Sequence, residues 1–310
     1  MSTTHVTRYP PEWLALREAA DAAARAPELL EPLRRHLPRP AGPGNRPGRD
    51  APLVIRDLGC GTGSMGRWLA PRLEGPQHWI LHDHDPDLLD LAAESMPRTA
   101  ADGSPVTVTT ERSDIARLTA DALAGTSLVT ASALLDLLTR DELDGLVAAC
   151  SGARCPALLA LSVLGRVDLA PADPMDADIT DAFNAHQRRC DQGRRLLGPD
   201  AVAAASVAFA RHGMTVRVQT SPWRLGAASR NAACPDDAST GTRDAAPMTA
   251  LTAEWLRGWV GAARTQRPEL AARADAYLRR RLAACEAGEL RVVVHHSDVL
   301  ALPRRTDVTS

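Results

Sequence analysis

The chain has 310 residues, enough for one large or two modest domains, and 45% of them are hydrophobic, so a sizeable core can form. The formal net charge is −2, which gives no overall positive field to attract nucleic acid or an anionic membrane. All 36 basic residues are arginine, which excludes lysine chemistry such as Schiff bases and P-loop phosphate binding.

The cysteines and the N-terminus indicate a reducing compartment. Six cysteines are scattered without a Cys-x-x-Cys pair, and the first residues lack the apolar segment of a signal peptide. We therefore expect free buried thiols in place of disulfides. No apolar run approaches the ~18 residues of a transmembrane helix. The sequence predicts a cytoplasmic protein without a membrane partner.

The first 50 residues are expected to form an N-terminal helical cap followed by a linker. Residues 12–37 are rich in Ala, Leu, Arg and Glu, and Pro27 and Pro32 are predicted to divide them into short helices. A Pro/Gly/Arg-rich linker then runs from Pro38 to Pro52. The main domain is expected to cover residues 51–310.

Residues 53–66 predict a buried strand, a glycine turn and a helix in direct succession. Residues 53–55 form a short apolar run with β-branched members, and Gly59, Gly61 and Gly63 follow at alternate positions. A strand that passes through such a turn into a helix brings bare backbone N–H groups to a ligand at the helix N-terminus. Side chains there would block the approach, which explains the glycines.

This turn fits two kinds of ligand. Gly61, Gly63 and Gly66 match the G-x-G-x-x-G dinucleotide fingerprint. Asp57, however, stands just before the turn, and its carboxylate would repel a pyrophosphate but hold a ligand that carries an ammonium group. The pattern resembles the first motif of the class I S-adenosylmethionine-dependent methyltransferases, in which an acid precedes three spaced glycines (here Asp57, Gly59, Gly61 and Gly63).

Apolar runs and helix signals alternate through the rest of the chain. Asp85 with Pro86, and Thr139 with Glu142, predict helix starts. The alternation predicts an α/β fold with a doubly wound, mostly parallel sheet and helices on both faces. The resemblance implies seven strands, the last one antiparallel. After the first strand we expect strands at 78–83, 106–110, 127–131, 157–163, 214–219 and 290–296.

Two insertions are expected in this main domain, at about 165–199 and 221–288. The first contains a polar helix around 183–195. The second contains a loop at 226–247, predicted to be mobile from its low hydrophobic content, and a helical pair at 251–264 and 268–286. The resemblance does not extend to the cap or to these insertions.

The resemblance implies S-adenosyl-L-methionine as the cofactor and assigns roles to residues at the strand ends. Asp57 and the glycines would hold its methionyl end. Asp83, which ends the second strand, would accept both ribose hydroxyls. His84 would lie against the adenosine, where the family often has an apolar residue. An alternating His82–His84 pair also suggests a metal, but no third ligand is placed by the sequence, so we expect no metal site.

The third and fourth strands supply the remaining cofactor candidates. Asp114 resembles the acid that accepts from the adenine amino group, and Ile115 the apolar neighbour that covers the ring. A loop acid beside a buried isoleucine is the alternative. Ala131 and Ser132 end the fourth strand, where the family backbone reaches the amino group of the cofactor.

Asp136 and His186 are the candidate catalytic residues. Asp136 lies inside an apolar run, at a place where many family members carry histidine. An acid is costly to bury without a partner, and a raised pKa would suit a general base. A hydrogen-bonded structural carboxylate explains it equally well. His186 is the second candidate base, and Tyr9 or Trp13 would cover the cofactor, although a surface histidine and core aromatics are the simpler explanations.

These features predict an enzyme that moves a methyl group from S-adenosylmethionine to an oxygen or nitrogen of a small molecule. The balanced charge argues against nucleic acid, and the helical insertions would wall a closed pocket. A homodimer is compatible with the sequence. Two alternatives stay open: an NAD(P)-dependent oxidoreductase that uses Gly61, Gly63 and Gly66, and a non-catalytic S-adenosylmethionine-binding partner subunit.

Overall fold

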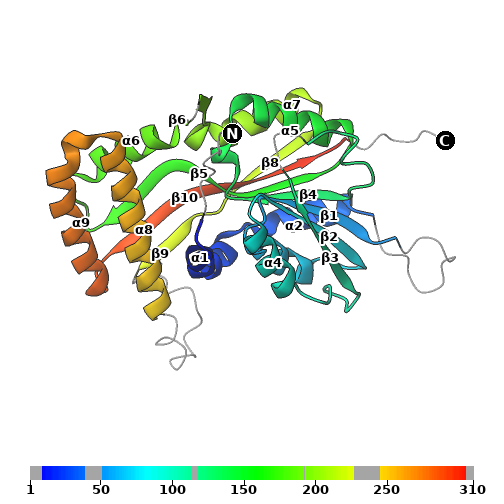
Figure 1. Cartoon of the computed structure of the whole chain (residues 1–310), viewed down its shortest axis with the longest axis horizontal. Coiled ribbons are helices and arrows are strands. Elements are labelled where there is room, and N and C mark those ends of the chain that lie inside the picture. The colour runs from blue at the N-terminus through cyan, green and yellow to red at the C-terminus, as the bar shows by residue number, and fades with distance from the viewer. Residues whose placement is uncertain (1–8, 39–50, 114–117, 192, 227–244, 305–310) are drawn as a thin grey trace.

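A computed structural model describes residues 9–38, 51–113, 118–191, 193–226 and 245–304. The described residues form one eight-stranded sheet and a separate two-stranded hairpin (Figure 1). The sheet consists of β1 (Leu53–Leu58), β2 (Gln77–Asp83), β3 (Val106–Arg112), β4 (Leu128–Ser132), β5 (Ala157–Ala170), β8 (Thr215–Thr220), β9 (Trp223–Gly226) and β10 (Arg291–Leu302). The hairpin pairs β6 (Cys190–Asp191) with β7 (Arg194–Arg195).

The strand order is β3-β2-β1-β4-β5-β10-β8, with β9 paired to β10. Strands β1 to β5 pair in parallel, and β10 is antiparallel to β5, β8 and β9. This confirms the predicted doubly wound, mostly parallel sheet with an antiparallel last strand. Seven strands lie in the main order, and β9 is an addition that the sequence did not predict.

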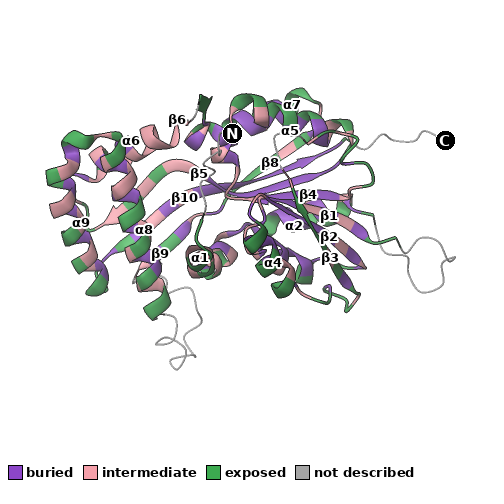
Figure 2. Cartoon of the chain, viewed as in Figure 1, coloured by how far each residue is buried: buried purple, intermediate pink, exposed green. Residues whose placement is uncertain are grey.

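Helices cover the sheet on both faces. They are α1 (Pro11–Ala24), α2 (Leu30–His36), α3 (Ser64–Leu69), α4 (Pro86–Ser95), α5 (Arg140–Gly152), α6 (Asp176–Gln187), α7 (Ala201–Arg211), α8 (Ala245–Gln266) and α9 (Ala271–Glu286). One buried cluster joins α2, α3 and α4 to the sheet, and another joins α5 and α7 to it. The central strands are correspondingly buried, and the outer faces of the helices are exposed (Figure 2).

Two helix starts agree with the sequence signals. The Asp85 side chain accepts a hydrogen bond from the backbone N–H of Asp87 at 3.1 Å, with Pro86 as the first helical residue. Thr139 and Glu142 form a reciprocal capping box at the start of α5. Pro27 begins a short 3-10 turn as expected, but Pro32 lies within the first turn of α2, where its missing N–H removes no helical hydrogen bond.

The fifth strand is longer than predicted. The apolar run predicts a strand that ends at 163, yet β5 continues to Ala170 because β10 pairs with it as far as Arg291. The stretch from Gly165 therefore begins as strand, not as an insertion. Likewise β9 lies in the stretch expected to be an insertion from 221, since Trp223 and Leu225 are buried at alternate positions against β10. A third buried cluster joins these extensions to α6, α8 and α9.

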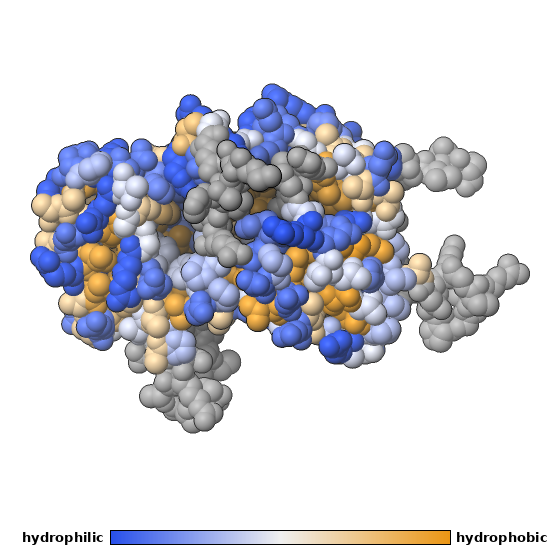
Figure 3. All heavy atoms as spheres, in the orientation of Figure 1, coloured by the Kyte–Doolittle hydropathy of each residue, from blue (hydrophilic) through white to orange (hydrophobic). Residues whose placement is uncertain are grey.

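The described cysteines are free, and four of them are buried as predicted, while Cys190 is exposed. No helix of the described residues has both the length and the apolar character of a membrane span. On the face seen in Figure 3, hydrophobic side chains lie in groups separated by hydrophilic ones. The predicted loop at 226–247 falls almost entirely on residues 227–244, outside the described residues.

The packing of α7 gives a test of this core. Phe209 is fully buried between α7 and the sheet, whereas Val207 on the same helix is 46% exposed. We expect Phe209→Ala to lower the free energy of unfolding by about 3–5 kcal/mol, because it removes packing and leaves a cavity. Val207→Ala should change it by less than about 0.5 kcal/mol. Urea unfolding measures both, and equal losses would contradict the placement of α7.

Candidate functional site

The glycine turn after β1 leaves little room for side chains at two of its positions. Gly59, Gly61 and Gly63 have φ values of 62°, 54° and 87°, in the left-handed region. A Cβ on Gly61 would lie 3.2 Å from Cδ1 of Leu14 in α1, and one on Gly63 would lie 3.2 Å from Cβ of Ala92 in α4. The turn is thus formed by glycine both for its backbone conformation and for the close approach of two helices.

An ion pair fastens α1 over this turn. Nε and Nη2 of Arg67 in α3 each lie 2.6 Å from a carboxylate oxygen of Glu18 in α1. Nη1 of Arg67 also donates to the Thr62 carbonyl and to the Ser95 hydroxyl. A forked arginine–carboxylate pair fixes orientation as well as distance. The N-terminal helix is therefore held against the glycine turn by a pairing that the sequence pattern did not reveal.

Asp83 lies against the glycine turn. Its Oδ2 accepts a hydrogen bond from the backbone N–H of Gly61 at 2.9 Å, and its Oδ1 accepts one from that of Asp85 at 3.0 Å. Nδ1 of His84 lies 3.2 Å from the same Oδ1. A carboxylate can accept about four hydrogen bonds, so the buried Asp83 keeps capacity for a ligand with hydroxyl groups.

Asp57 is buried at the end of β1 with half of its carboxylate satisfied. The Thr130 hydroxyl donates to Oδ1 at 2.7 Å, whereas Oδ2 has no hydrogen-bond partner among the described residues. Burial raises the pKa of Asp57 to about 7. The Thr130 hydrogen bond and the positive charge of Arg25 both lower this pKa, but burial has the larger effect. An unsatisfied buried oxygen is costly, and a cationic donor from a ligand would remove that cost.

Arg25, at the C-terminal end of α1, is a residue that the sequence analysis missed. It is 2% exposed, and its Nη2 donates to the hydroxyls of Ser64 at 3.0 Å and Ser132 at 3.2 Å. Its guanidinium carbon lies 5.6 Å from the centre of the Trp68 ring. No local signal distinguishes it, because an arginine in an arginine-rich helical segment is ordinarily exposed.

The other predicted cofactor residues have mixed outcomes. Ala131 is buried in β4, and Ser132 at its end contacts Arg25. Asp114 and Ile115 lie outside the described residues. The nitrogens of His82 lie near Ser113 and Arg56, at 2.8 Å and 3.0 Å. Within the described ranges, no group of three or more potential metal ligands occurs.

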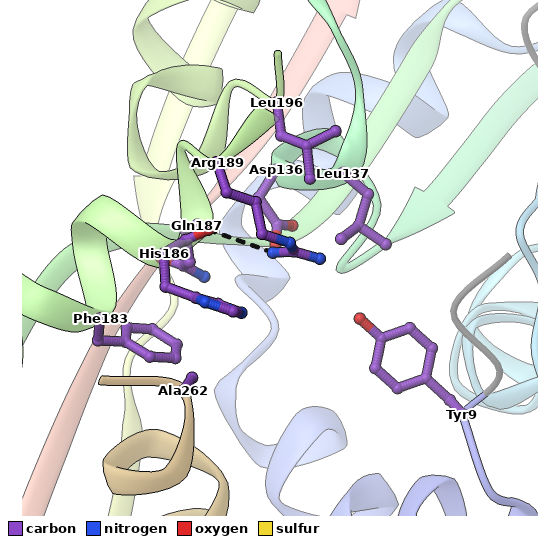
Figure 4. Close-up of a pocket in the computed structure, with 9 residues that line it drawn as sticks. All are labelled: Tyr9, Asp136, Leu137, Phe183, His186, Gln187, Arg189, Leu196 and Ala262. Carbon is purple, nitrogen blue, oxygen red and sulfur yellow. Dashed lines mark hydrogen bonds between the residues drawn. The ribbon is translucent and has the colours of Figure 1, made fainter. Parts of the chain in front are cut away.

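A cavity of about 220 Å³ brings both candidate catalytic residues together (Figure 4). Asp136 comes from a 3-10 turn after β4 (Leu135–Leu137), His186 from α6, and Tyr9 from the segment before α1. Trp13 packs into the cluster with α8 and does not line this cavity. The lining residues are Tyr9, Asp136, Leu137, Phe183, His186, Gln187, Arg189, Leu196 and Ala262.

The charges around this cavity suit proton transfer. Burial raises the pKa of Asp136 to about 6. Its backbone hydrogen bond and the positive charges of Arg17 and Arg189 lower this pKa, but burial has the larger effect. Burial and the negative charge of Asp136 raise the pKa of Tyr9, so its phenol stays protonated at neutral pH. Burial and Arg189 lower the pKa of His186, which favours a neutral imidazole. The cavity therefore presents a carboxylate able to accept a proton near neutral pH.

Part of the chain matches one known protein family. Residues 55–154 match the family described as a methyltransferase domain. Among curated proteins, none matches the sequence.

Similar solved structures include loganic acid methyltransferase with SAH, at 12% identity over 96% of both chains and a TM-score of 0.45. Another is a SAM-dependent methyltransferase from Thiobacillus denitrificans in complex with S-adenosyl-L-homocysteine, at 15% identity over 96% of this chain and 100% of that one, with a TM-score of 0.42. A third, from Geobacter sulfurreducens with the same ligand, has 14% identity, covers 95% and 99% of the two chains, and has a TM-score of 0.40.

The raised pKa of Asp57 predicts a pH-dependent stability. Between its ordinary value of 3.8 and about 7, the folded protein binds a proton that the unfolded chain lacks. The contribution of Asp57 to stability therefore falls as the pH rises through this window. Asp57→Asn keeps an acceptor for Thr130 but does not titrate. We expect the free energy of unfolding of the variant, relative to wild type, to increase from pH 4 to pH 7.

Urea unfolding at several pH values measures this difference, and the exposed Asp121→Asn serves as the control. The free energy of unfolding of the control should change with pH as that of wild type does. If that of Asp57→Asn also changed in the same way, the carboxylate of Asp57 would not be held in a desolvated site.

Proposed function

We propose that the chain is an S-adenosylmethionine-dependent methyltransferase that methylates an oxygen or nitrogen atom of a small molecule, a proposal supported by the match of residues 55–154 to a methyltransferase domain and by the order of the strands. The observation that carries this proposal is the arrangement at one edge of the sheet. Asp57 and Asp83 lie at the carboxyl ends of β1 and β2, the glycine turn follows β1, and Asp136 of the cavity follows β4. Open α/β sheets bind their ligands at this edge.

The residues at the strand ends fit S-adenosyl-L-methionine. The free Oδ2 of Asp57 suits the ammonium group, and the remaining acceptor capacity of Asp83 suits the two ribose hydroxyls. We propose that the backbone of this left-handed glycine turn approaches the methionyl end. We further propose that His84 lies against the adenosine and that Ile115 covers the adenine ring.

The remaining contacts in the proposal come from the third and fourth strands. Asp114 would accept from the adenine amino group, and the backbone of Ala131 and Ser132 would face the amino group of the methionyl end. These assignments rest on position after the strands.

When bound, S-adenosylmethionine supplies a methyl group activated by a sulfonium charge, and transfer to an acceptor lone pair breaks the carbon–sulfur bond and leaves S-adenosylhomocysteine. In our proposal Asp136 accepts the proton that the acceptor O–H or N–H loses. A pKa of about 6 suits a base that works near neutral pH. His186 is a second proton acceptor on the same cavity, and the protonated Tyr9 orients the acceptor by a hydrogen bond.

The cavity supports a small acceptor. Its volume of about 220 Å³ lies below the ~300–1,000 Å³ typical of pockets for drug-sized ligands. Leu137, Phe183 and Ala262 give it apolar walls beside the polar groups. An acceptor with an apolar body and one ionisable O–H or N–H fits this lining. We propose that the N-terminal cap at 1–50 and the inserted helices α6 and α8 determine which acceptor enters.

Calorimetric titration with S-adenosylhomocysteine tests the cofactor assignment. We expect wild type to bind it, and Asp83→Ala to weaken binding by about tenfold or more, because buried hydrogen bonds to the ribose are lost. The exposed Asp121→Ala should bind as wild type does, and NADPH should not bind. Absence of binding by wild type, or undiminished binding by Asp83→Ala, would remove the proposal, and NADPH binding would favour an oxidoreductase.

Asp136→Asn tests the proposed base. We expect this variant to lose about 100-fold or more of the methyl transfer from labelled S-adenosylmethionine to a fractionated metabolite extract, while its affinity for S-adenosylhomocysteine stays unchanged. The wild-type rate should rise as the pH passes through about 6, because Asp136 must be ionised to accept a proton.

Two results would oppose this role. A variant that keeps both the full rate and the same pH profile would make Asp136 structural. Cofactor binding by wild type without labelled product from any fraction would favour a non-catalytic partner subunit.

A further inference from the structure

Arg25 and Asp57 are two buried charged groups whose hydrogen-bonding capacity is only partly used. Arg25 is 2% exposed and Asp57 is 1% exposed. Nε and Nη1 of Arg25, and Oδ2 of Asp57, have no hydrogen-bond partner in the described part of the chain. A buried charged atom without a hydrogen-bond partner costs free energy, so such atoms are rare in folded proteins. Here two groups of opposite charge at one site both have them. The pair therefore points to a ligand with both charges.

The two groups are held on the same face of β4. Thr130 donates to Asp57 at 2.7 Å, and Ser132 accepts from Arg25 at 3.2 Å. Strand residues two positions apart point to the same face, about 7 Å apart along the strand. A negative and a positive group thus lie side by side at the carboxyl end of the strand, where the ligand edge of the sheet begins.

Two acids whose negative charge acts on Arg25 already accept hydrogen bonds from other groups. Asp21 accepts from Arg17 at 2.9 Å and from the indole N–H of Trp223 at 2.9 Å. Asp298 accepts from the backbone N–H groups of Ala26 and Leu161, both at 2.8 Å. These carboxylates offset part of the positive charge of Arg25, but neither accepts a hydrogen bond from its Nε or Nη1, which have no partner among the described residues.

The position of Arg25 is fixed before any ligand arrives. Its Nη2 is held by Ser64 at the start of α3 as well as by Ser132, and Trp68 lies under the guanidinium. The pairing of Glu18 with Arg67 holds α1 itself against the glycine turn. A group that is already ordered loses little conformational entropy when it binds a ligand.

We propose that Arg25 binds the carboxylate of the amino-acid end of the cofactor while Asp57 binds the ammonium, so that the two residues form one clamp for a zwitterion. The inference rests on the proposed function and deepens it. An α-amino acid group carries both charges on a single carbon atom, which matches two adjacent buried sites of opposite sign. The guanidinium is the side chain best suited to a carboxylate. The clamp makes the protein selective against adenosyl compounds that lack the carboxylate.

The test compares two ligands by calorimetry. Wild type is titrated with S-adenosylhomocysteine and with decarboxylated S-adenosylhomocysteine, which keeps the adenosine and the ammonium. We expect about 10- to 100-fold tighter binding of the first, since a charged hydrogen-bonded contact is lost in the second. In Arg25→Met this preference should vanish, because affinity for S-adenosylhomocysteine falls and affinity for the decarboxylated ligand does not.

Arg34→Met is the matched control. Arg34 is an exposed arginine of the same N-terminal segment, where it donates to the carbonyl of Arg72. This variant should keep the wild-type preference between the two ligands. Circular dichroism shows whether each variant is folded.

The outcomes separate the clamp from the proposed function. Equal affinity of wild type for both ligands would overturn the clamp, and this measurement needs no variant. Equal weakening of both ligands in a folded Arg25→Met would assign the residue a structural role and also overturn the clamp. If wild type bound neither ligand, the proposed function itself would fail.

Discussion

The arrangement of this site depends on a carboxylate buried at the end of the central strand. Asp57 lies where the order of the sheet reverses, since β2 leads away from β1 on one side and β4 on the other. Burial there raises its pKa to about 7, so the fold maintains an energetically unfavourable group. Thr130 on β4 relieves part of the cost. In our proposal the remainder would be relieved by a cationic ligand group at the free oxygen, which would link ligand binding to the stability of the edge.

The N-terminal helix connects the two halves of the site. Leu14 packs against the glycine turn, Glu18 pairs with Arg67, and Arg25 reaches the end of β4. On its other side, α1 contacts β9 and α8, which belong to the stretch after β8. Tyr9, just before α1, lines the cavity that contains Asp136. The helix thus packs against the glycine turn, and the residue just before it lines the cavity, so a shift of α1 would affect both.

Local sequence signals predicted the seven strands of the main order, two helix starts and the acid–glycine motif. Those features depend on residues close in sequence: apolar runs, capping side chains and backbone conformations that only glycine adopts easily. Asp136 was also found in this way, because an acid inside an apolar run is unfavourable unless it has a partner or a role. The structure places it with His186 on one cavity.

Long-range pairing decided the features that the sequence did not predict. Gly165 and Pro171 favour a break after 163, but β10 pairs along the extended β5 and overrides that local preference. The roles of Arg25 and Asp298 depend on partners more than 100 positions away in the chain. Nothing in their neighbouring residues indicates such contacts, so only the fold reveals them.

A crystal structure of the protein with S-adenosylhomocysteine would test the central claim most directly. We expect the ammonium group about 3 Å from Oδ2 of Asp57, and the ribose hydroxyls at a similar distance from Asp83. A ligand bound away from the carboxyl end of β1, or one whose ammonium group faces solvent while Oδ2 of Asp57 stays unpaired, would contradict it.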